Sequence, residues 1–235
     1  MIGGFSRNIS YIAAFIPHHF STLGIAQKMD TPVIPLDKRF RGFLPVIIDI
    51  ETAGFNPKKN ALLEIAAVIV EFDGNRNLEI TERYTTHVIP FKNSELDEAA
   101  LKFNKIDPHH PFRMAIDEKD ALNMLFKPIK EAVKRNNCTR AILVGHNPAF
   151  DIGFLNAAIQ RTQIKRSPFH PFSTFDTATL GGLVYQQTVL AKMAQAAGLE
   201  WDNDKAHSAL YDAEKTAELF CRIVNRWKHL ESSDS

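Results

Sequence analysis

Two acidic residues, Asp49 and Glu51, close the apolar run VIIDIET at residues 46–52. Alternate residues of a strand point to the same face of a sheet, so both carboxylates project together while Ile48 and Ile50 point into a core. Carboxylates held side by side repel each other, and a hard cation such as Mg²⁺ relieves the repulsion because it prefers oxygen ligands. The alternative is an exposed strand end with two solvated acids, and the pair alone does not decide between them.

A third acid, Asp151, ends the sequence GHNPAFD at residues 145–151, where a short apolar run gives way to an expected helix. The helix dipole favours a carboxylate in the first turn, so Asp151 is either an ordinary capping acid or a further member of the site. We interpret His146 and Asn147 as residues that fix the turn. Phe150 is either a core residue or a platform for stacking.

A fourth acid, Asp212, follows His207 in HSALYDAEKTAELF at residues 207–220. Each step along a helix turns the side chain by about 100°, which puts Asp212 at the rim of the apolar stripe that this helix should bury. A carboxylate at the edge of a core is costly unless a positive group meets it. His207 lies at or just before the start of the expected helix and could reach the same point; its alternative is a capping or surface histidine.

The elements that would position these residues follow from the hydrophobic pattern. Strands are expected at residues 46–50, 61–72, 80–89, 141–144 and 173–175. Helices are expected at residues 94–103, 117–135, 150–161, 177–197 and 207–228. We expect Ser94 to cap the helix at residues 94–103. Asp176 is a candidate cap for the helix at residues 177–197. Strands that come first and then alternate with helices indicate an α/β protein whose mixed sheet has helices on both faces.

Composition narrows the class of protein. Of 235 residues, 45% are hydrophobic and 23% are charged, and the net charge is +1, as in ordinary soluble proteins. Nucleic-acid binding would therefore depend on local basic clusters. No apolar run approaches the roughly 18 residues of a membrane span, so no membrane partner is expected. Cys138 and Cys221 lie far apart and outside any CxxC pattern, which favours a reducing, cytoplasmic setting.

The N-terminal part of the sequence differs from the remainder. Charged side chains in residues 1–30 are limited to Arg7, Lys28 and Asp30. We expect a poorly ordered extension over residues 1–36, a globular domain over 37–230 and a tail over 231–235. A translation start at Met29 would remove most of the extension.

Together, the four acids and the histidine resemble the three motifs of the DEDDh family of exonucleases. Asp49 and Glu51 in DIET, Asp151 in HNxxFD, and the pair His207-xxxx-Asp212 occur in the order of that family. Further segments resemble the branch of the family that trims tRNA: KRFRGFLP (38–45), DIETAGFN (49–56), FNKIDP (103–108), SPFHPFSTFDTA (167–178) and FCRIVNRWK (220–228). The resemblance extends over about residues 37 to 230. It implies an RNase H-like mixed sheet of about five strands with helices on both faces.

The resemblance implies a 3′→5′ exoribonuclease that trims short single-stranded 3′ ends of tRNA and other stable RNAs and releases nucleoside 5′-monophosphates. Asp49, Glu51, Asp151 and Asp212 would hold two Mg²⁺ ions, or Mn²⁺, and His207 would take the proton of the attacking water. A DNA proofreading or repair exonuclease is the second candidate, since the sequence shows no contact to a 2′-hydroxyl. The third is a nucleic-acid-binding module without catalysis, against which all five catalytic positions carry the family's residue types.

Substrate-binding residues are implied in the same way. Aromatic residues that match those stacking on the terminal bases are Phe55, Phe103, Phe150 and Phe172. Basic residues that match those holding phosphates include Arg39, Arg41, Lys134, Arg140 and Lys165. The alternatives are core packing for the phenylalanines and solvated surface for the basic residues. In this branch, basic residues of one subunit present RNA to the active site of the other, which implies a homodimer.

One position departs from the family pattern. Where the family has a glutamate four residues before the second stacking phenylalanine, here Phe103, this chain has Ala99, with Glu98 beside it. That glutamate is tied to the family's reluctance to remove a terminal cytosine. A shift by one residue turns a helical side chain by about 100°, so Glu98 is a poor substitute. We expect weaker discrimination against 3′ cytosine.

Overall fold

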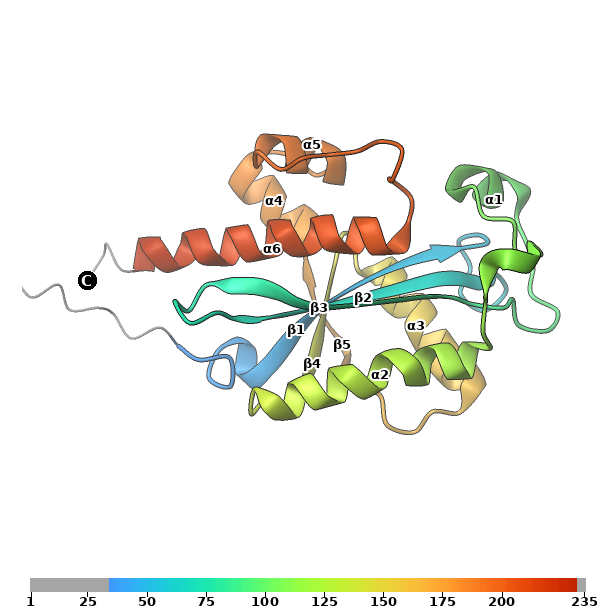
Figure 1. Cartoon of the computed structure of the whole chain (residues 1–235), viewed down its shortest axis with the longest axis horizontal. Helices are drawn as coiled ribbons and strands as arrows, with labels where there is room; N and C mark the ends of the chain where they lie inside the picture. The colour runs from blue at the N-terminus through green and yellow to red at the C-terminus, as the bar shows by residue number, and fades with distance from the viewer. Residues whose placement is uncertain (1–33, 232–235) are drawn as a thin grey trace, which may run out of the picture. The chain divides into compact units, whose positions relative to one another are not determined.

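Five strands form one mixed sheet, in the order β3-β2-β1-β4-β5, in a computed structural model that describes residues 34–231 (Figure 1). The strands are β1 (Phe43–Thr52), β2 (Leu62–Phe72), β3 (Leu78–His87), β4 (Arg140–Gly145) and β5 (Phe169–Asp176). The helices are α1 (Glu98–Asn104), α2 (Glu118–Arg135), α3 (Ala149–Thr162), α4 (Thr177–Tyr185), α5 (Leu190–Ala196) and α6 (Ala209–Glu231). Strand β1 is antiparallel to β2 and parallel to β4, so the predicted mixed sheet is confirmed.

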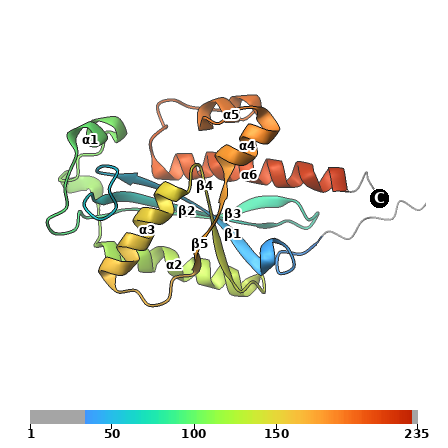
Figure 2. The ribbon, with the colours of Figure 1, turned by 180° about the vertical axis from the view of Figure 1, so that it is seen from behind.

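Helices cover both faces of this sheet, as predicted. Helix α6 packs against β1, β2 and β3, and α4 and α5 lie on the same side (Figure 1). Helices α2 and α3 lie on the opposite side, which is seen from behind in Figure 2. Within residues 34–231, no helix is both long and apolar enough to cross a lipid bilayer.

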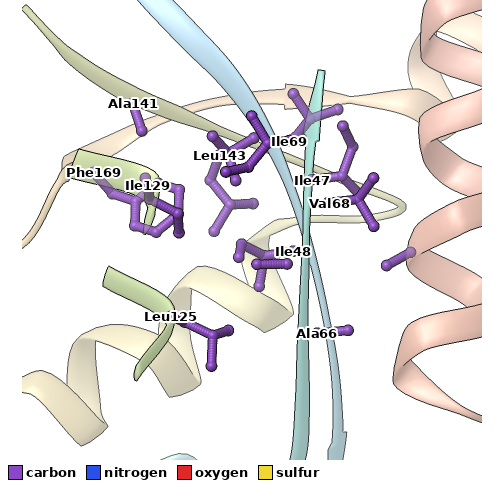
Figure 3. Packing of buried hydrophobic residues seen from close by; sticks show 14 of the residues in the cluster. Ile47, Ile48, Ala66, Val68, Ile69, Leu125, Ile129, Ala141, Leu143 and Phe169 are labelled. Atoms are coloured by element: carbon purple, nitrogen blue, oxygen red, sulfur yellow. The ribbon is translucent and has the colours of Figure 1, made fainter. Parts of the chain in front are cut away.

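The core fills the space on both sides of β1. Figure 3 shows Ile47 and Val68 directed toward α6, whereas Ile48 lies on the side of Leu125 and Ile129 from α2. Ile48 is 1% exposed and Ile50 is 6% exposed, which confirms that both point into the core. Because side chains alternate along a strand, Asp49 and Glu51 share the face of Ile47, toward α6.

The predicted terminal segments fall mostly outside the described residues. This applies to residues 1–33, which include the proposed start at Met29, and to residues 232–235. Leu36 belongs to the expected extension and is nevertheless buried in the main core, with 4% of its surface exposed.

The start of α1 was wrongly predicted. Asp97 caps this helix by accepting a hydrogen bond from the backbone N–H of Ala100, at 3.0 Å. Ser94, the expected cap, lies earlier in a turn, and the next residue, Glu95, donates its backbone N–H to the carbonyl of Lys59 at 2.8 Å. A tertiary contact therefore occupies the segment that sequence propensity assigned to the helix.

The single helix expected over residues 177–197 is also wrong, because the structure divides it into α4 and α5. Helix α4 ends at Tyr185, and the next residue, Gln186, caps it with a left-handed backbone of φ 56°. Its start was predicted correctly, since the Asp176 carboxylate accepts hydrogen bonds from the backbone N–H groups of Ala178 at 2.9 Å and Thr179 at 3.3 Å.

Candidate active site

Three of the four predicted acids meet above the end of β1. Asp49 and Glu51 come from this strand, and Asp212 comes from the first turn of α6. One carboxylate oxygen from each of the three lies within 4.8 Å of the others. The Oδ2 atom of Asp212 accepts a hydrogen bond from the backbone N–H of His207 at 3.1 Å, while Oδ1 is buried with no partner among the described residues. An oxygen-only group with an unpartnered buried oxygen fits a hard divalent cation.

The fourth acid, Asp151, comes from α3 and lies beside this group of three, but it is neither a member of the group nor part of the cavity wall described below. It is 5% exposed and lies in the first turn of the helix, but the N-cap position is Pro148. Repulsion from Asp151 is the largest charge effect on Asp49, so the two carboxyl groups are close neighbours. Asp151 is therefore a buried neighbour of the other acids and not a surface capping residue.

Burial raises the pKa of each of these four carboxyl groups, and repulsion from neighbouring acids adds to the effect at Asp49, Glu51 and Asp212. Burial, followed by repulsion from Asp212, Glu64 and Asp151, raises the pKa of Glu51 to about 8. Burial raises the pKa of Asp151 to about 7, although backbone N–H groups donate to its carboxylate. The pKa of Asp49 lies well above its usual range, and burial raises that of Asp212. Without a cation, the ionised cluster is therefore unfavourable, and a bound cation would remove the conflict.

The metal-free protein should become more stable when the pH falls from about 8.5 to about 6.5, because its folded state takes up protons in this window. The pKa of Glu51, about 8, and that of Asp151, about 7, exceed those of ordinary carboxyl groups. The stabilisation is therefore present at low pH and lost as the pH rises through these values. Calorimetry in chelator would measure the shift in Tm.

Saturating Mg²⁺ provides the control for this pH experiment. Metal binding requires ionised carboxylates, so the added metal should remove or reverse the pH dependence between the same two values. A Tm in chelator that falls or stays constant as the pH is lowered would contradict the electrostatic account.

A cavity of ≈ 400 Å³ opens above the acids. The predicted catalytic residues in its wall are Asp49, Glu51, His207 and Asp212. The predicted stacking residues in its wall are Phe55, Phe103 and Phe150. The remaining wall consists of Ile50, Thr52, Gly54, Ala99, Ala100 and Asn104. Acidic side chains and aromatic side chains therefore line the same cavity.

A glycine turn after β1 presents Phe55 at the cavity. Gly54 has φ +145°, and a Cβ there would lie 2.5 Å from the side chain of Asn60, so the close approach requires glycine. Asn60 secures the turn by accepting from the backbone N–H of Asn56 at 2.8 Å. Phe55 remains 84% exposed, with its ring centroid 6.2 Å from that of Phe150.

Helix α1 brings Phe103 opposite the histidine. The side-chain amide of Asn104 donates to the backbone carbonyl of Thr52 at 3.0 Å, which ties α1 to the end of β1. Phe103 is 64% exposed, and its ring centroid lies 4.3 Å from that of His207. His207 is itself exposed and has a left-handed backbone with φ 67°. Both rings therefore offer free surface to a ligand in the cavity.

Phe172, the fourth predicted stacking residue, does not line this cavity. It lies on β5, is 78% exposed, and packs edge-on against His170 with ring centroids 4.5 Å apart. His170 also packs against Phe43, over which the Arg41 guanidinium lies at 5.1 Å. Arg140 is opposite Phe43 in the β1–β4 register. We call Arg41, Phe43, Arg140, His170 and Phe172 the β5 surface.

The predicted phosphate-binding residues differ from Arg135 and Arg161 in their pairing. In the part of the chain that the structure describes, no ion pair involves Arg39, Arg41, Lys134, Arg140 or Lys165. By contrast, Arg135 pairs with Glu71 and Glu82, and Arg161 pairs with Glu118 at 2.7 Å. The unpaired set retains its charge for external anions.

Glu64 was not identified from the sequence as part of the site's surroundings. It lies in the apolar run LLEIAAVIV of β2 and is only 7% exposed. A single acid within an apolar strand was the signal that could have revealed this residue. His146 lies outside the cavity wall, and its ring nitrogens contact Thr177 Oγ1 at 3.2 Å and the Thr188 carbonyl at 2.9 Å. These contacts agree with the interpretation that His146 fixes a turn.

The sequence matches known nucleases over most of its length. The profile of the exonuclease family RNase_T matches residues 46–220. Ribonuclease T of Hahella chejuensis is 55% identical over 206 residues, which cover 88% of this chain and 94% of the relative. Ribonuclease T of Photorhabdus laumondii subsp. laumondii is 55% identical over 195 residues, which cover 83% and 90%.

Solved structures share the fold. The nuclease domain of 3′hExo, a DEDDh family member bound to rAMP, matches with a TM-score of 0.61 and 21% identity, over 77% of this chain and 92% of that one. E. coli exonuclease I in complex with a dT13 oligonucleotide matches with a TM-score of 0.61 and 17% identity, over 80% of this chain and 42% of that one. These likenesses show the predicted RNase H-like fold. With the profile and the curated relatives, they lead to one conclusion: the chain belongs to the ribonuclease T family of DEDDh exonucleases.

Proposed function

We propose that this protein is a metal-dependent 3′→5′ exoribonuclease that trims short single-stranded 3′ ends of tRNA and other stable RNAs. The observation that carries the proposal is the cavity in which Phe55 and Phe103 stand above the acid cluster with its unpartnered Asp212 oxygen. The 3′→5′ exonuclease class follows from the family, and the RNA substrate is inferred from relatives named ribonuclease T. The products would be nucleoside 5′-monophosphates.

The four acids and His207 would have different roles in this reaction. Asp49, Glu51, Asp151 and Asp212 would hold two divalent ions, Mg²⁺ or Mn²⁺, through carboxylate oxygens. When bound, such ions supply positive charge that activates a water and stabilises the charge developing on the phosphate and leaving oxygen. His207 would accept the proton of the attacking water from its position at the cavity wall.

The aromatic walls would hold the last bases of the strand. A base stacked on an aromatic side chain gains roughly 1–3 kcal/mol, with little dependence on sequence. Phe55, Phe103 and Phe150 line the cavity and are available for this role. Such stacking needs bases that are splayed out of a helix, so unpaired 3′ ends are the substrates that fit.

We also propose a homodimer in which the β5 surface of one subunit presents RNA to the cavity of the other. Arg41, Arg140 and Phe172 support this arrangement because they are exposed and lie outside their own subunit's cavity. Arg39, Lys134 and Lys165 would add further phosphate contacts. The enzyme would act in the cytoplasm, and the free thiols of Cys138 and Cys221 are compatible with that reducing compartment.

An RNA hairpin with a single-stranded 3′ overhang tests the function. With Mg²⁺, the overhang should shorten one nucleotide at a time and stop near the stem, and excess chelator should abolish the reaction. Gel analysis of 5′-labelled RNA with chromatography of the products would measure both steps. A DNA hairpin of matched sequence is the control. Faster digestion of DNA would favour the repair exonuclease, and internal cleavage would contradict both.

The departure at Ala99 predicts a change in base preference. Ala99 lines the cavity, whereas Glu98 does not. The wild-type protein should remove terminal A and C at similar rates, and Ala99→Glu should slow removal of C by about tenfold, the effect of one hydrogen bond of about 1.4 kcal/mol. Single-turnover rates on oligonucleotides ending in A or C would measure the ratio. Glu98→Ala is the control and should not alter it; strong arrest of the wild-type protein at C would refute the prediction.

A further inference from the structure

Glu64 is a fifth acid next to the site. It lies on β2 directly opposite Glu51 of β1 in the antiparallel register. Opposite residues of two strands point to the same face with Cβ atoms about 5 Å apart, and like charges in such a pair are destabilising. Glu64 is 7% exposed, so water does little to screen the two carboxylates from each other.

Within residues 34–231, no basic side chain forms an ion pair with Glu64, although the charge of Arg113 acts on it from nearby. Its carboxylate accepts a long hydrogen bond of 3.4 Å from the Thr85 hydroxyl. The guanidinium of Arg113 lies near but donates to the backbone carbonyls of Leu63 at 2.7 Å and Pro108 at 3.1 Å. His87, opposite Glu64 on β3, has a buried Nδ1 that lacks a partner in the described structure.

Glu118, an acid that is buried to a similar extent, is compensated by a basic side chain. It is 8% exposed, and Arg161 donates to both of its oxygens, at 2.7 Å and 3.1 Å. A buried carboxylate that is neither paired in this way nor exposed is costly. The unpaired Glu64 therefore points to a positive charge on the side of Glu51.

Glu64 is nevertheless not a direct ligand in this arrangement. The group whose ligand atoms lie within 4.8 Å of one another comprises Asp49, Glu51 and Asp212. The β1–β2 register shifts just beyond Glu51, where Leu62 is opposite Thr52 and Leu63 becomes the extra residue of a bulge. Glu64 thus stands one strand behind the ligands, at the last regular pair before the bulge.

We propose that Glu64 is a positioning residue of the metal centre, which acts through Glu51 and Asp212 to increase the affinity of the site for divalent cations. Glu64 lies on β2, the strand next to the one that carries Asp49 and Glu51. Its negative charge strengthens the electrostatic attraction of the site for cations, and bound cations would neutralise that charge. The inference rests on the proposed metal-dependent function. Removal of partners in this outer layer typically weakens metal binding by about 10–100-fold.

Glu64→Gln tests this role, because glutamine keeps the shape and removes the charge. Calorimetric titration of the full chain with Mn²⁺ should give a Kd about tenfold weaker than that of the wild-type protein. The Tm in chelator should be equal to or higher than that of the wild-type protein, because one of two opposed carboxylates is gone. Glu64→Asp, which keeps the charge, should bind Mn²⁺ more tightly than Glu64→Gln.

Glu118→Gln is the matched control. It should lower the Tm in chelator, because it breaks the ion pair with Arg161, and leave the Kd for Mn²⁺ unchanged. An unchanged Kd for Glu64→Gln would overturn the inference, whatever its Tm; a lower Tm in chelator would then assign Glu64 a structural role. If Glu64→Gln does not fold, Glu64→Asp decides: a Kd for Mn²⁺ close to that of the wild-type protein supports the inference, because the charge is kept, and a Kd about tenfold weaker overturns it. Failure of the wild-type protein to bind Mn²⁺ would instead overturn the proposed function.

Discussion

Asp49→Asn should reduce exonuclease turnover by about 10³-fold or more, equivalent to about 4 kcal/mol of transition-state stabilisation. Asp49 is one of the three acids that could hold an ion, and repulsion from Asp151, Asp212, Glu51 and Glu64 adds to burial in raising its pKa. Asparagine has nearly the same size but lacks the charge that would hold the ions. Turnover on the 3′-overhang hairpin would measure the loss.

The same variant should still fold and bind RNA. The cavity walls formed by Phe55 and Phe103 are untouched, so the Kd for a single-stranded oligonucleotide should change little. The Tm in chelator should not fall, because the change removes one member of a mutually repelling group. Asp120→Asn on the exposed surface of α2 is the matched control and should digest RNA normally. Normal digestion by Asp49→Asn itself would eliminate the metal role of the acid cluster.

His207→Asn should lower kcat by about 10²–10⁴-fold, the range for loss of a general base, while metal binding persists. The His207 ring is not part of the three-acid group that could hold an ion. Asparagine is suited to this position because it tolerates the left-handed backbone, φ 67°, better than most residues. The backbone N–H of residue 207 can then still donate to Asp212, as it does at 3.1 Å in the native chain.

Mn²⁺-induced stabilisation separates this variant from Asp49→Asn. The rise in Tm on adding Mn²⁺ should match that of the wild-type protein for His207→Asn and be lost for Asp49→Asn. His109→Asn, at an exposed position after α1, controls for the loss of an imidazole and should retain full activity. A loss of Mn²⁺ stabilisation in His207→Asn would show that the histidine is a ligand, contrary to the proposed role.

The acids were predictable because each one carries a local signal in the sequence. Asp49 and Glu51 alternate with buried residues of a strand, and Asp212 lies at the rim of an apolar helical stripe. Such signals depend only on the periodicity of one element. Their convergence was not derivable from periodicity; it came from the resemblance and then from the packing of α3 and α6 against the sheet.

Features that depend on tertiary contacts were missed. Ser94 has the right chemistry for a helix cap, but the pairing of the next residue with Lys59 delays α1 until Asp97. For Phe172, the sequence could not foretell that its side chain packs on His170 outside this cavity, and its role in stacking stays a prediction. Glu64 looked like one polar residue in a strand, and only the register with Glu51 reveals two opposed charges.

The order in which the acids occur along the chain has a consequence during synthesis. Asp49 is made early and Asp151 later, but Asp212 belongs to α6, which follows every other described strand and helix. A nascent chain that has not yet been extended to α6 therefore lacks the last of the predicted acids. Under the proposed function, the cation site above β1 cannot assemble before α6 has been synthesised.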